Sequence, residues 1–207
     1  SVPSAGGHST PGASWVFTFD QLQAQGAFFA TKMNGEDLPL DHGFPIRLIV
    51  PGWYGCCSIK WVDQIRLVDE NEWATSQMQE FASRTHQNGV PMLARDYIPA
   101  SMDQAAMPIR VEKWRLNNEI TYRIVGVMWG GYEPTDSLTI QCGREPWQKV
   151  QICQEQTTNA TWSLWSYLWK PAERGVYKIA MQVADSGIPT RRLDMGWYER
   201  SVRIDEV

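Results

Sequence analysis

The chain has 207 residues, of which 43% are hydrophobic, and this length is enough to bury the core of one large domain or of two small ones. Its net charge is -4, so no overall field attracts nucleic acid or an anionic membrane, and neither is expected as a partner. No segment has the roughly 18 consecutive apolar residues of a membrane-spanning helix. We therefore expect a globular protein in which any anion-binding site is local.

The beginning of the chain, SVPSAGGHSTPG, is rich in Gly, Ser and Pro and predicts an irregular lead-in. It has neither the basic region nor the apolar region of an export signal. Because the chain starts at Ser1 and not at a methionine, we expect a processed or recombinant product, or a piece of a longer polypeptide.

Short helix, strand and turn signals follow in close succession. Thr18 and Gln21 form a capping-box pair, which predicts a helix over residues 18–25. A strand is expected over residues 27–33, and the Asn34-Gly35 dipeptide that follows is typical of hairpin turns.

Two further strands are expected on either side of the loop GWYGCC. Residues 44–51 form an apolar run closed by a Pro-Gly pair, and residues 58–69 alternate in polarity. The inward positions of the second strand are expected to be Ile59, Trp61, Ile65 and Leu67. Residues 71–89 lack strand character and predict a helix.

The second half of the chain differs from the first in its pattern of strand and turn signals. Seven short runs rich in β-branched and aromatic residues are separated by turn signals: RVEKWRL, EITYRIVGVMW, DSLTIQC, WQKVQIC, TWSLWSYLW, GVYKIAMQVAD and WYERSVRI. This spacing is typical of an immunoglobulin-like antiparallel β-sandwich. We therefore predict an α+β, mostly β fold with two domains, residues 1–100 and residues 101–207.

The four cysteines do not form a metal-binding pattern. Cys56 and Cys57 are adjacent, and Cys142 and Cys153 stand alone, so there is no CxxC pair and no metal-ligating residue is predicted. A hairpin turn over GREPW would place Cys142 opposite Gln148, with Cys153 too far along the partner strand for a disulfide.

The stretch LPLDHGFPIRLIVPGWYGCCSIKW combines glycines with hydrogen-bond donors. Gly52 and Gly55 let the backbone turn sharply and approach a ligand, which exposes N–H groups. His42, Arg47 and Lys60 are three potential donors to a phosphate, and the arginine offers a planar, bidentate fork. The residue types alone indicate a local anion site, while each of the three taken singly is also explained as a solvated strand residue or a turn-stabilising residue.

Residues 33–61, MNGEDLPLDHGFPIRLIVPGWYGCCSIKW, are similar to a segment of the sulfite oxidase family of molybdenum enzymes. The general form of that segment is MNG-x-x-LP-x-DHG-x-P-x-R-x-x-x-PG-x-x-G-x-x-S-x-KW, and the match has no gap. The hairpin TIQCGREPWQKV and the tryptophan-rich TWSLWSYLW resemble parts of the family's immunoglobulin-like dimerisation domain. The resemblance implies the C-terminal portion of a molybdopterin-binding domain over residues 1–100 and a dimerisation domain over residues 101–207.

The resemblance also implies the cofactor and the residues that hold it. In the family, this loop binds part of the pyranopterin that carries molybdenum through its dithiolene. The cofactor-binding residues implied here are His42 and Arg47, at the pterin and its phosphate, and Ser58, Ile59 and Lys60 on the following strand. Tyr97 is the candidate for the family's active-site tyrosine, and the alternative is a tyrosine that packs at the domain junction.

The chain departs from the family pattern at several positions. The family's molybdenum-ligating cysteine lies upstream of the histidine-glycine motif, so the resemblance implies that this thiolate is not in the present chain. Cys56 and Cys57 occupy the places of a small residue and an arginine. Tyr132 and Glu133 follow the Gly-Gly run where sulfite-oxidising members commonly carry an arginine. Because a pocket for a doubly charged anion needs such cations, the substrate is left open.

Two functions follow as hypotheses. The first is the C-terminal half of a molybdopterin-dependent oxidoreductase that carries out two-electron oxo transfer on a small substrate, sulfur-containing or not. Its expected partners are a second copy bound through the sandwich, the upstream half of the cofactor domain, and an electron acceptor such as a cytochrome. By analogy with bacterial relatives its location would be the periplasm. The alternative is a non-catalytic scaffold that dimerises and binds an anion or nothing.

Overall fold

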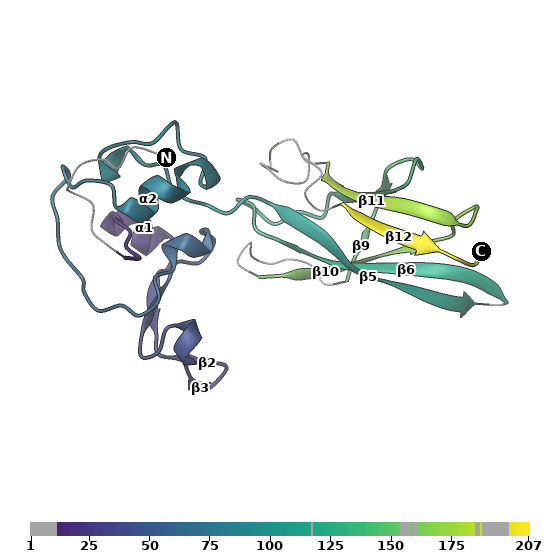
Figure 1. The fold of residues 1–207 in the computed structure, drawn as a ribbon, viewed down its shortest axis with the longest axis horizontal. Coiled ribbons are helices and arrows are strands. Elements are labelled where there is room, and N and C mark those ends of the chain that lie inside the picture. Colours follow the sequence, from purple (N-terminus) through teal and green to yellow (C-terminus); the bar gives the residue numbers. More distant parts are fainter. Residues whose placement is uncertain (1–11, 117, 154–157, 159–160, 185–186, 188–198) are drawn as a thin grey trace. The chain divides into compact units, whose positions relative to one another are not determined.

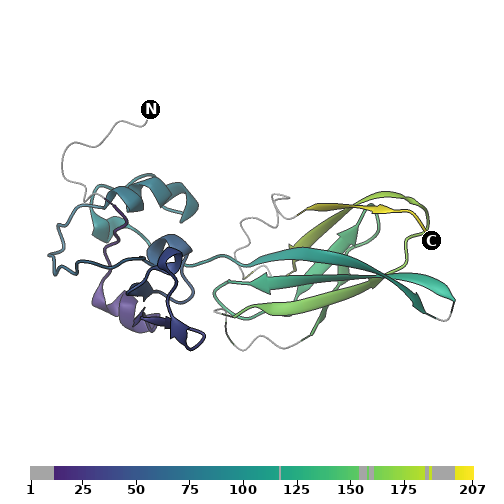
Figure 2. The same cartoon turned by 60° about the horizontal axis from the view of Figure 1, so that its bottom comes forward.

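The computed structural model describes residues 12–116, 118–153, 158, 161–184, 187 and 199–207. The chain divides into two compact units, Ser1–Met102 and Asp103–Val207. Within the described ranges, helices occur in the first unit and the longer strands in the second, which confirms the mostly β, α+β fold (Figures 1 and 2). None of the helices in the described ranges is long and apolar enough to cross a membrane.

The first helix of the first unit, α1 (Phe19–Ala24), is the one that the capping box predicts. The backbone N–H of Gln21 donates to Thr18 Oγ1 at 3.1 Å, and Gln21 Oε1 accepts from the backbone N–H of Thr18 at 3.0 Å. None of the helix's own residues is buried. Its start is therefore stabilised by these two local hydrogen bonds more than by core packing.

The strands of the first unit are short and pair in two small sheets. The strand β1 (Phe28–Ala30) pairs antiparallel with β4 (Arg47–Ile49). The strand β2 (Lys32–Met33) pairs with β3 (Glu36–Asp37), and the intervening Asn34-Gly35 has φ values of 55° and 88°. Positive φ at both positions is what a type I′ hairpin turn requires, so the predicted turn is confirmed.

The strand predicted over residues 58–69 is wrong. Three of its four supposedly inward residues are exposed, namely Trp61, Ile65 (71%) and Leu67 (84%). The left-handed φ of 53° at Trp61 interrupts the alternation of inward and outward side chains. The segment makes one backbone bond to the β4 region on each side of Trp61, from Leu48 N–H to the Ile59 carbonyl at 2.8 Å and from Val62 N–H to the Ile46 carbonyl at 3.1 Å.

A helix is present within residues 71–89, but it is shorter than the predicted span. The helix α2 (Ser76–Phe81) starts after Thr75, whose hydroxyl accepts from the Met78 N–H at 3.2 Å. It continues as a 3-10 turn, η3 (Ala82–Arg84). The other 3-10 turns described in this unit are η1 (Leu40–His42), η2 (Gly55–Cys57) and η4 (Ala94–Asp96).

The buried residues of the first unit form two small clusters. The loop cluster consists of Val50, Trp53, Cys57 and Ala100. The helix cluster consists of Ala74, Met78, Ala82, Ala94 and Tyr97. Partly buried Trp15 packs against both clusters.

The second unit is an antiparallel β-sandwich, as predicted. Its strands are β5 (Ala105–Leu116), β6 (Glu119–Trp129), β7 (Leu138–Cys142), β8 (Gln148–Lys149), β9 (Gln151–Ile152), β10 (Ser163–Trp169), β11 (Gly175–Val183) and β12 (Arg200–Ile204). One sheet has the order β5-β6-β10-β9 and the other β12-β11-β7-β8. In the strand lettering of immunoglobulin-like domains, the first sheet has the order A-B-E-D. The second has the order G-F-C, with β8 as one added strand next to β7. One contiguous core, which includes Ile124, Trp165 and Ile179, fills the space between the sheets.

The run WQKVQIC is not the single strand that its composition predicts. The chain changes sheets at Val150, which is buried and donates its N–H to the Leu138 carbonyl at 3.1 Å. The predicted register is also wrong by two residues, because Gln148 lies opposite Ile140 and not opposite Cys142. All four cysteines are free thiols.

Candidate functional site

Gly43 lies at the centre of the candidate site. It follows η1 with a φ of 111°, and its N–H donates to the Leu40 carbonyl at 3.3 Å. A Cβ at this position would lie 3.1 Å from Arg47 Cβ and 3.2 Å from Lys60 Cβ. We call this arrangement of Gly43, Arg47 and Lys60 the Gly43 cradle, because two cationic residues flank a backbone position that has little space for a side chain.

Arg47 is positioned by β4, and its guanidinium is only partly satisfied. Its Nη1 donates to the backbone carbonyl of His42 at 3.0 Å. Its Nε is buried and has no hydrogen-bond partner within the described ranges. A buried donor without an acceptor is costly, so this nitrogen is available to an acceptor that the structure does not contain.

Lys60 approaches the same turn from the segment after η2. Its Nζ donates to the backbone carbonyl of Asp41 at 2.7 Å and lies 5.6 Å from the centroid of the Trp61 ring. The neighbouring Trp61 donates its Nε1–H to the Leu40 carbonyl at 2.8 Å. Neither Arg47 nor Lys60 forms an ion pair with a carboxylate in the described part of the chain, so the two positive charges are not neutralised there.

The remaining residues predicted to bind a cofactor take different places. The His42 ring is about half exposed, with Nε2 3.8 Å from Asp41 Oδ2. Ser58 Oγ accepts from the Val50 N–H at 3.1 Å, and the Ile59 carbonyl accepts from Leu48 N–H. Ser58 and Ile59 therefore join their segment to the β4 region, and this attachment places Lys60 beside Gly43.

Tyr97 lies in the helix cluster and not in the Gly43 cradle. Its side chain is 7% exposed, and its hydroxyl has no hydrogen-bond partner among the residues that the structure describes. Burial raises the pKa of Tyr97 to about 12. At neutral pH the group is a neutral phenol in apolar surroundings.

The described ranges contain no group of three or more His, Cys, Asp or Glu side chains that could hold a metal ion. Cys57 is fully buried in the loop cluster, and the Cys56 thiol beside it is partly exposed. The Gly43 cradle therefore offers donors to an anionic organic group and no ligand set for a metal.

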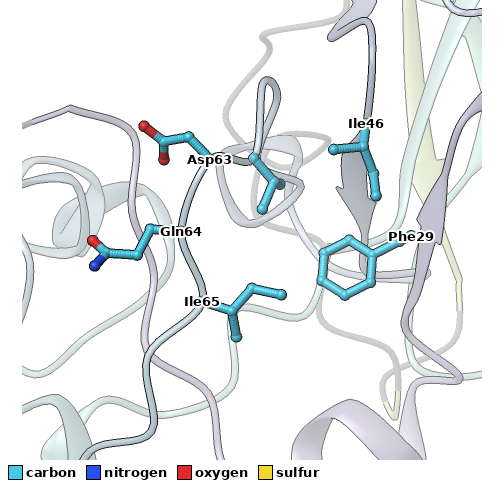
Figure 3. Close-up of a pocket in the computed structure, with 6 residues that line it drawn as sticks. Phe29, Ile46, Asp63, Gln64 and Ile65 are labelled. Atoms are coloured by element: carbon cyan, nitrogen blue, oxygen red, sulfur yellow. The ribbon is translucent and has the colours of Figure 1, made fainter.

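A hollow of about 260 Å³ lies near the cradle's strand, lined by Phe29, Ile46, Val62, Asp63, Gln64 and Ile65. Figure 3 shows the side chains of Ile46 and Ile65 pointing toward the Phe29 ring, while those of Asp63 and Gln64 point away from it. The lining is apolar and its single charge is negative, so the hollow does not suit an anionic ligand.

The sequence patterns named most of this site but not its centre. Gly52 and Gly55 were the glycines expected to permit close approach, yet a Cβ on Gly55 would meet nothing within 4 Å. Gly43, which the patterns did not single out, is the crowded position. The available signal was the Asp-His-Gly triplet, because a glycine directly after a short polar turn is typical of a left-handed cap.

Comparison with known protein families gives a match in the first part of the chain. Residues 7–76 match the family described as "Oxidoreductase molybdopterin binding domain". This range contains every residue of the Gly43 cradle.

Several enzymes are similar to parts of this chain. The mitochondrial sulfite oxidase of Drosophila melanogaster is 30% identical over 150 residues, which cover 66% of this chain and 26% of that protein. The sulfite oxidase of Arabidopsis thaliana is 54% identical over 41 residues, 20% of this chain and 10% of that protein. The NADPH nitrate reductase of Fusarium oxysporum is 48% identical over 46 residues, which cover 22% of this chain and 5% of that protein. The chain thus spans about a quarter or less of the curated relatives.

One solved structure shares the fold over most of the chain. The sulfane dehydrogenase SoxCD from Paracoccus pantotrophus superposes with a TM-score of 0.58 and 20% sequence identity, covering 84% of this chain and 43% of that one. At this identity, the likeness concerns the fold.

Proposed function

Because this chain belongs to the sulfite oxidase family of molybdopterin-dependent oxidoreductases, we propose that the Gly43 cradle holds the pterin and phosphate end of the molybdenum cofactor. When bound, the cofactor supplies a centre for two-electron oxo transfer to or from a small substrate, sulfur-containing or not. The residues of the chain contribute binding, orientation and charge.

The observation that carries this proposal is the pair of cationic residues without carboxylate partners, on either side of Gly43. A phosphate placed there would accept from Arg47 Nε, the buried donor that has no partner in the described structure. It would also offset the charge of Lys60, whose Nζ donates to the Asp41 carbonyl and lies over the Trp61 ring. Charge-assisted hydrogen bonds of this kind are roughly twice as strong as neutral ones. The absence of a Cβ at Gly43 lets Arg47 and Lys60 pack closely against this turn, which brings the two cationic residues together.

The other predicted residues take supporting roles in this proposal. The half-exposed ring of His42 is placed to contact the pterin, while Ser58 and Ile59 fix the segment that presents Lys60. A catalytic role for Tyr97 stays a prediction. Such a role would need its buried hydroxyl to become accessible to substrate.

We further propose that the thiolate that ligates molybdenum comes from a segment upstream of this cofactor loop, in the same polypeptide or in a second chain. Support comes from the apolar surface of the first unit. Large side chains that are half exposed or more include Phe28, Ile65, Leu67, Val90 and Met92. Exposed apolar side chains in this number fit a unit that another part of the protein covers. A cytochrome electron acceptor and a periplasmic location stay predictions from the family resemblance.

The sandwich is proposed to form a homodimer through the outer face of the β5-β6-β10-β9 sheet. On β10, Leu164 and Leu168 are 52% and 57% exposed. On β11 of the other sheet, the exposed outward positions include Lys178 and Gln182. Two exposed leucines on β10, against a lysine and a glutamine on β11, favour the first face as the contact surface, which also carries the charged Arg123 and Glu112.

Sedimentation equilibrium tests the dimer. We expect the wild type to be dimeric and the double variant Leu164→Asp with Leu168→Asp to be monomeric, because burying two carboxylates in the contact surface costs more free energy than burying two leucines. The control is Val176→Asp, which changes an exposed apolar residue on the other sheet. A monomeric wild type, or equal dissociation in the control, would contradict the proposal.

The test of cofactor binding is Arg47→Ala in the full-length protein purified with its cofactor. We expect pterin and molybdenum content to fall by about tenfold or more, which corresponds to at least ~1.4 kcal/mol of binding. The free energy of unfolding should change little. Arg66→Ala is the matched control, since Arg66 is a half-exposed arginine of the same unit that pairs with Glu72 at 2.9 Å. Equal losses of cofactor and of stability would make Arg47 a structural residue.

A further inference from the structure

The adjacent thiols of Cys56 and Cys57 lie at the boundary between core and solvent. Both belong to η2, and their sulfurs are 3.9 Å apart, within hydrogen-bonding distance for sulfur. Cys57 is fully buried with Val50 and Trp53 in the loop cluster, whereas Cys56 is partly exposed. The two thiols therefore differ in access to solvent while remaining in contact.

The surroundings of the pair also distinguish the two sulfurs. The hydrogen bond from Cys57 lowers the pKa of the Cys56 thiol, burial opposes this, and the positive charge of Arg84 adds to the lowering. The same hydrogen bond and burial raise the pKa of the Cys57 thiol. Cys56 is thus the nucleophile of the pair, and Cys57 keeps its proton.

The backbone at Cys56 is held in place by a neighbouring helix. Gln77 on α2 donates from Nε2 to the Cys56 carbonyl at 2.9 Å. This contact holds η2 in an orientation in which Cys57 is buried in the loop cluster and Cys56 packs at the edge of that cluster, partly exposed to solvent. A reactive thiol that is accessible, with a second thiol in contact, is the arrangement of redox-sensing cysteines.

We propose that Cys56 and Cys57 form a reversible redox site whose substrate is a small peroxide. The Cys56 thiolate attacks the peroxide, the O–O bond breaks, and the products are a Cys56 sulfenic acid and a hydroxide or alkoxide ion. The Cys57 sulfur then displaces the sulfenic oxygen, and the S–S bond forms. The Cys57 proton leaves with that oxygen as water. The two electrons lost by the thiols reduce the peroxide, so the balance needs no other reactant.

Adjacency makes the product easy to reduce again. Consecutive Cα atoms are about 3.8 Å apart, whereas those of ordinary disulfides are usually separated by about 4.4–6.8 Å. A disulfide outside that range is strained, and strained disulfides are the labile ones. An added external thiol therefore restores the pair. This inference concerns the thiols alone and does not depend on the proposed cofactor function.

The test is peptide mass analysis of the full chain after treatment with hydrogen peroxide. Tryptic cleavage after Arg47 and Lys60 places both thiols in one peptide, apart from the other two cysteines. We expect this peptide to lose the mass of two hydrogen atoms and both alkylatable thiols, and to regain them with dithiothreitol. The exposed Cys153 serves as the internal control and should remain largely alkylatable at the same dose.

Two variants assign the roles. In Cys57→Ser, oxidation should stop at a Cys56 sulfenic acid that dimedone captures. In Cys56→Ser, Cys57 should stay reduced because it is buried. The proposal is overturned if Cys153 oxidises before the pair, if the pair over-oxidises without forming the disulfide, or if non-reducing gels show that Cys56 bridges two copies instead. A folded Cys57→Ser variant that yields no dimedone adduct also overturns it.

Discussion

Gly43 combines two separate constraints in one residue. Its φ of 111° disfavours any side chain, and the neighbouring Arg47 and Lys60 leave little space for one. These constraints belong to the same short loop that presents the two cationic residues. The conformation of the loop and its proposed function therefore depend on the same close packing of Arg47 and Lys60 against Gly43.

We predict that Gly43→Ala will lower the free energy of unfolding by about 1–3 kcal/mol, since it adds a strained φ and three close contacts, to Arg47 Cβ and to Lys60 Cβ and Cα. Urea denaturation measures the loss. Gly35→Ala is the matched control, because it has a φ of 88° but nothing within 4 Å of the new Cβ. Its expected cost is about 1 kcal/mol, from backbone strain alone. A smaller loss at Gly43 than at Gly35 would contradict the crowding seen in the loop.

Tyr97→Phe tests whether the buried hydroxyl makes a contact that the structure lacks. Because the hydroxyl has no partner in the described ranges, its removal should change stability at pH 7 by less than about 1 kcal/mol. In the unfolded chain the phenol ionises near pH 10, whereas in the fold its pKa is about 12. The stability contributed by the neutral phenol is therefore present below about pH 10 and is lost as the pH rises toward 12.

The phenylalanine variant should lack that alkaline loss, which denaturation curves at neutral and alkaline pH would show. A large destabilisation at pH 7 would mean that the hydroxyl has a partner. Identical alkaline behaviour of the two proteins would mean that Tyr97 ionises as in the unfolded chain, and thus is not buried.

Among the elements, local signals were the most informative about the fold. The capping box at Thr18 and the Asn34-Gly35 turn are set by neighbours in sequence, and both were predicted correctly. The polarity alternation of residues 58–69 was misleading, because one left-handed residue, Trp61, interrupts the alternation of inward and outward side chains. The sheet change at Val150 was not predictable from composition, since it depends on pairing with Leu138 on another strand.

The packing of Trp165 against Gly126 is a second feature that no local pattern reveals. The two residues are opposite each other on β10 and β6, and a Cβ on Gly126 would overlap both the Trp165 indole and the Met107 carbonyl. The indole nitrogen donates to the Val127 carbonyl at 3.0 Å, so the ring cannot move away without losing a buried bond.

Gly126→Ala should therefore cost about 3 kcal/mol of sandwich stability through overpacking. Thermal or denaturant unfolding followed by tryptophan fluorescence measures the effect. The control is Gly175→Ala on β11, whose new Cβ would lie 3.8 Å from the Tyr177 ring, an ordinary contact. It should be neutral or stabilising by about 0.5 kcal/mol. Equal behaviour of the two variants would refute the close approach at Gly126.

On the scale of the whole molecule, the two units are stabilised differently. The sandwich has one contiguous core, whereas the first unit has two small clusters and many exposed apolar side chains. Periodicity predicted the sandwich well, because the alternation of apolar and polar residues along a strand indicates which side chains are buried. It could not predict the Gly43 cradle, whose members come from η1, β4 and the segment after η2 and meet only in the fold. The motif resemblance, by contrast, singled out this loop, and the residues 7–76 that match the molybdopterin-binding family include it.

The central claim is that this loop holds a molybdenum cofactor, and the most direct test is the molybdenum and pterin content per mole of full-length protein purified gently from its source. We expect both to be close to stoichiometric, with the cofactor released when the protein unfolds. Folded, intact protein that contains neither molybdenum nor pterin would contradict the claim. That result would leave the non-catalytic scaffold as the function of the chain.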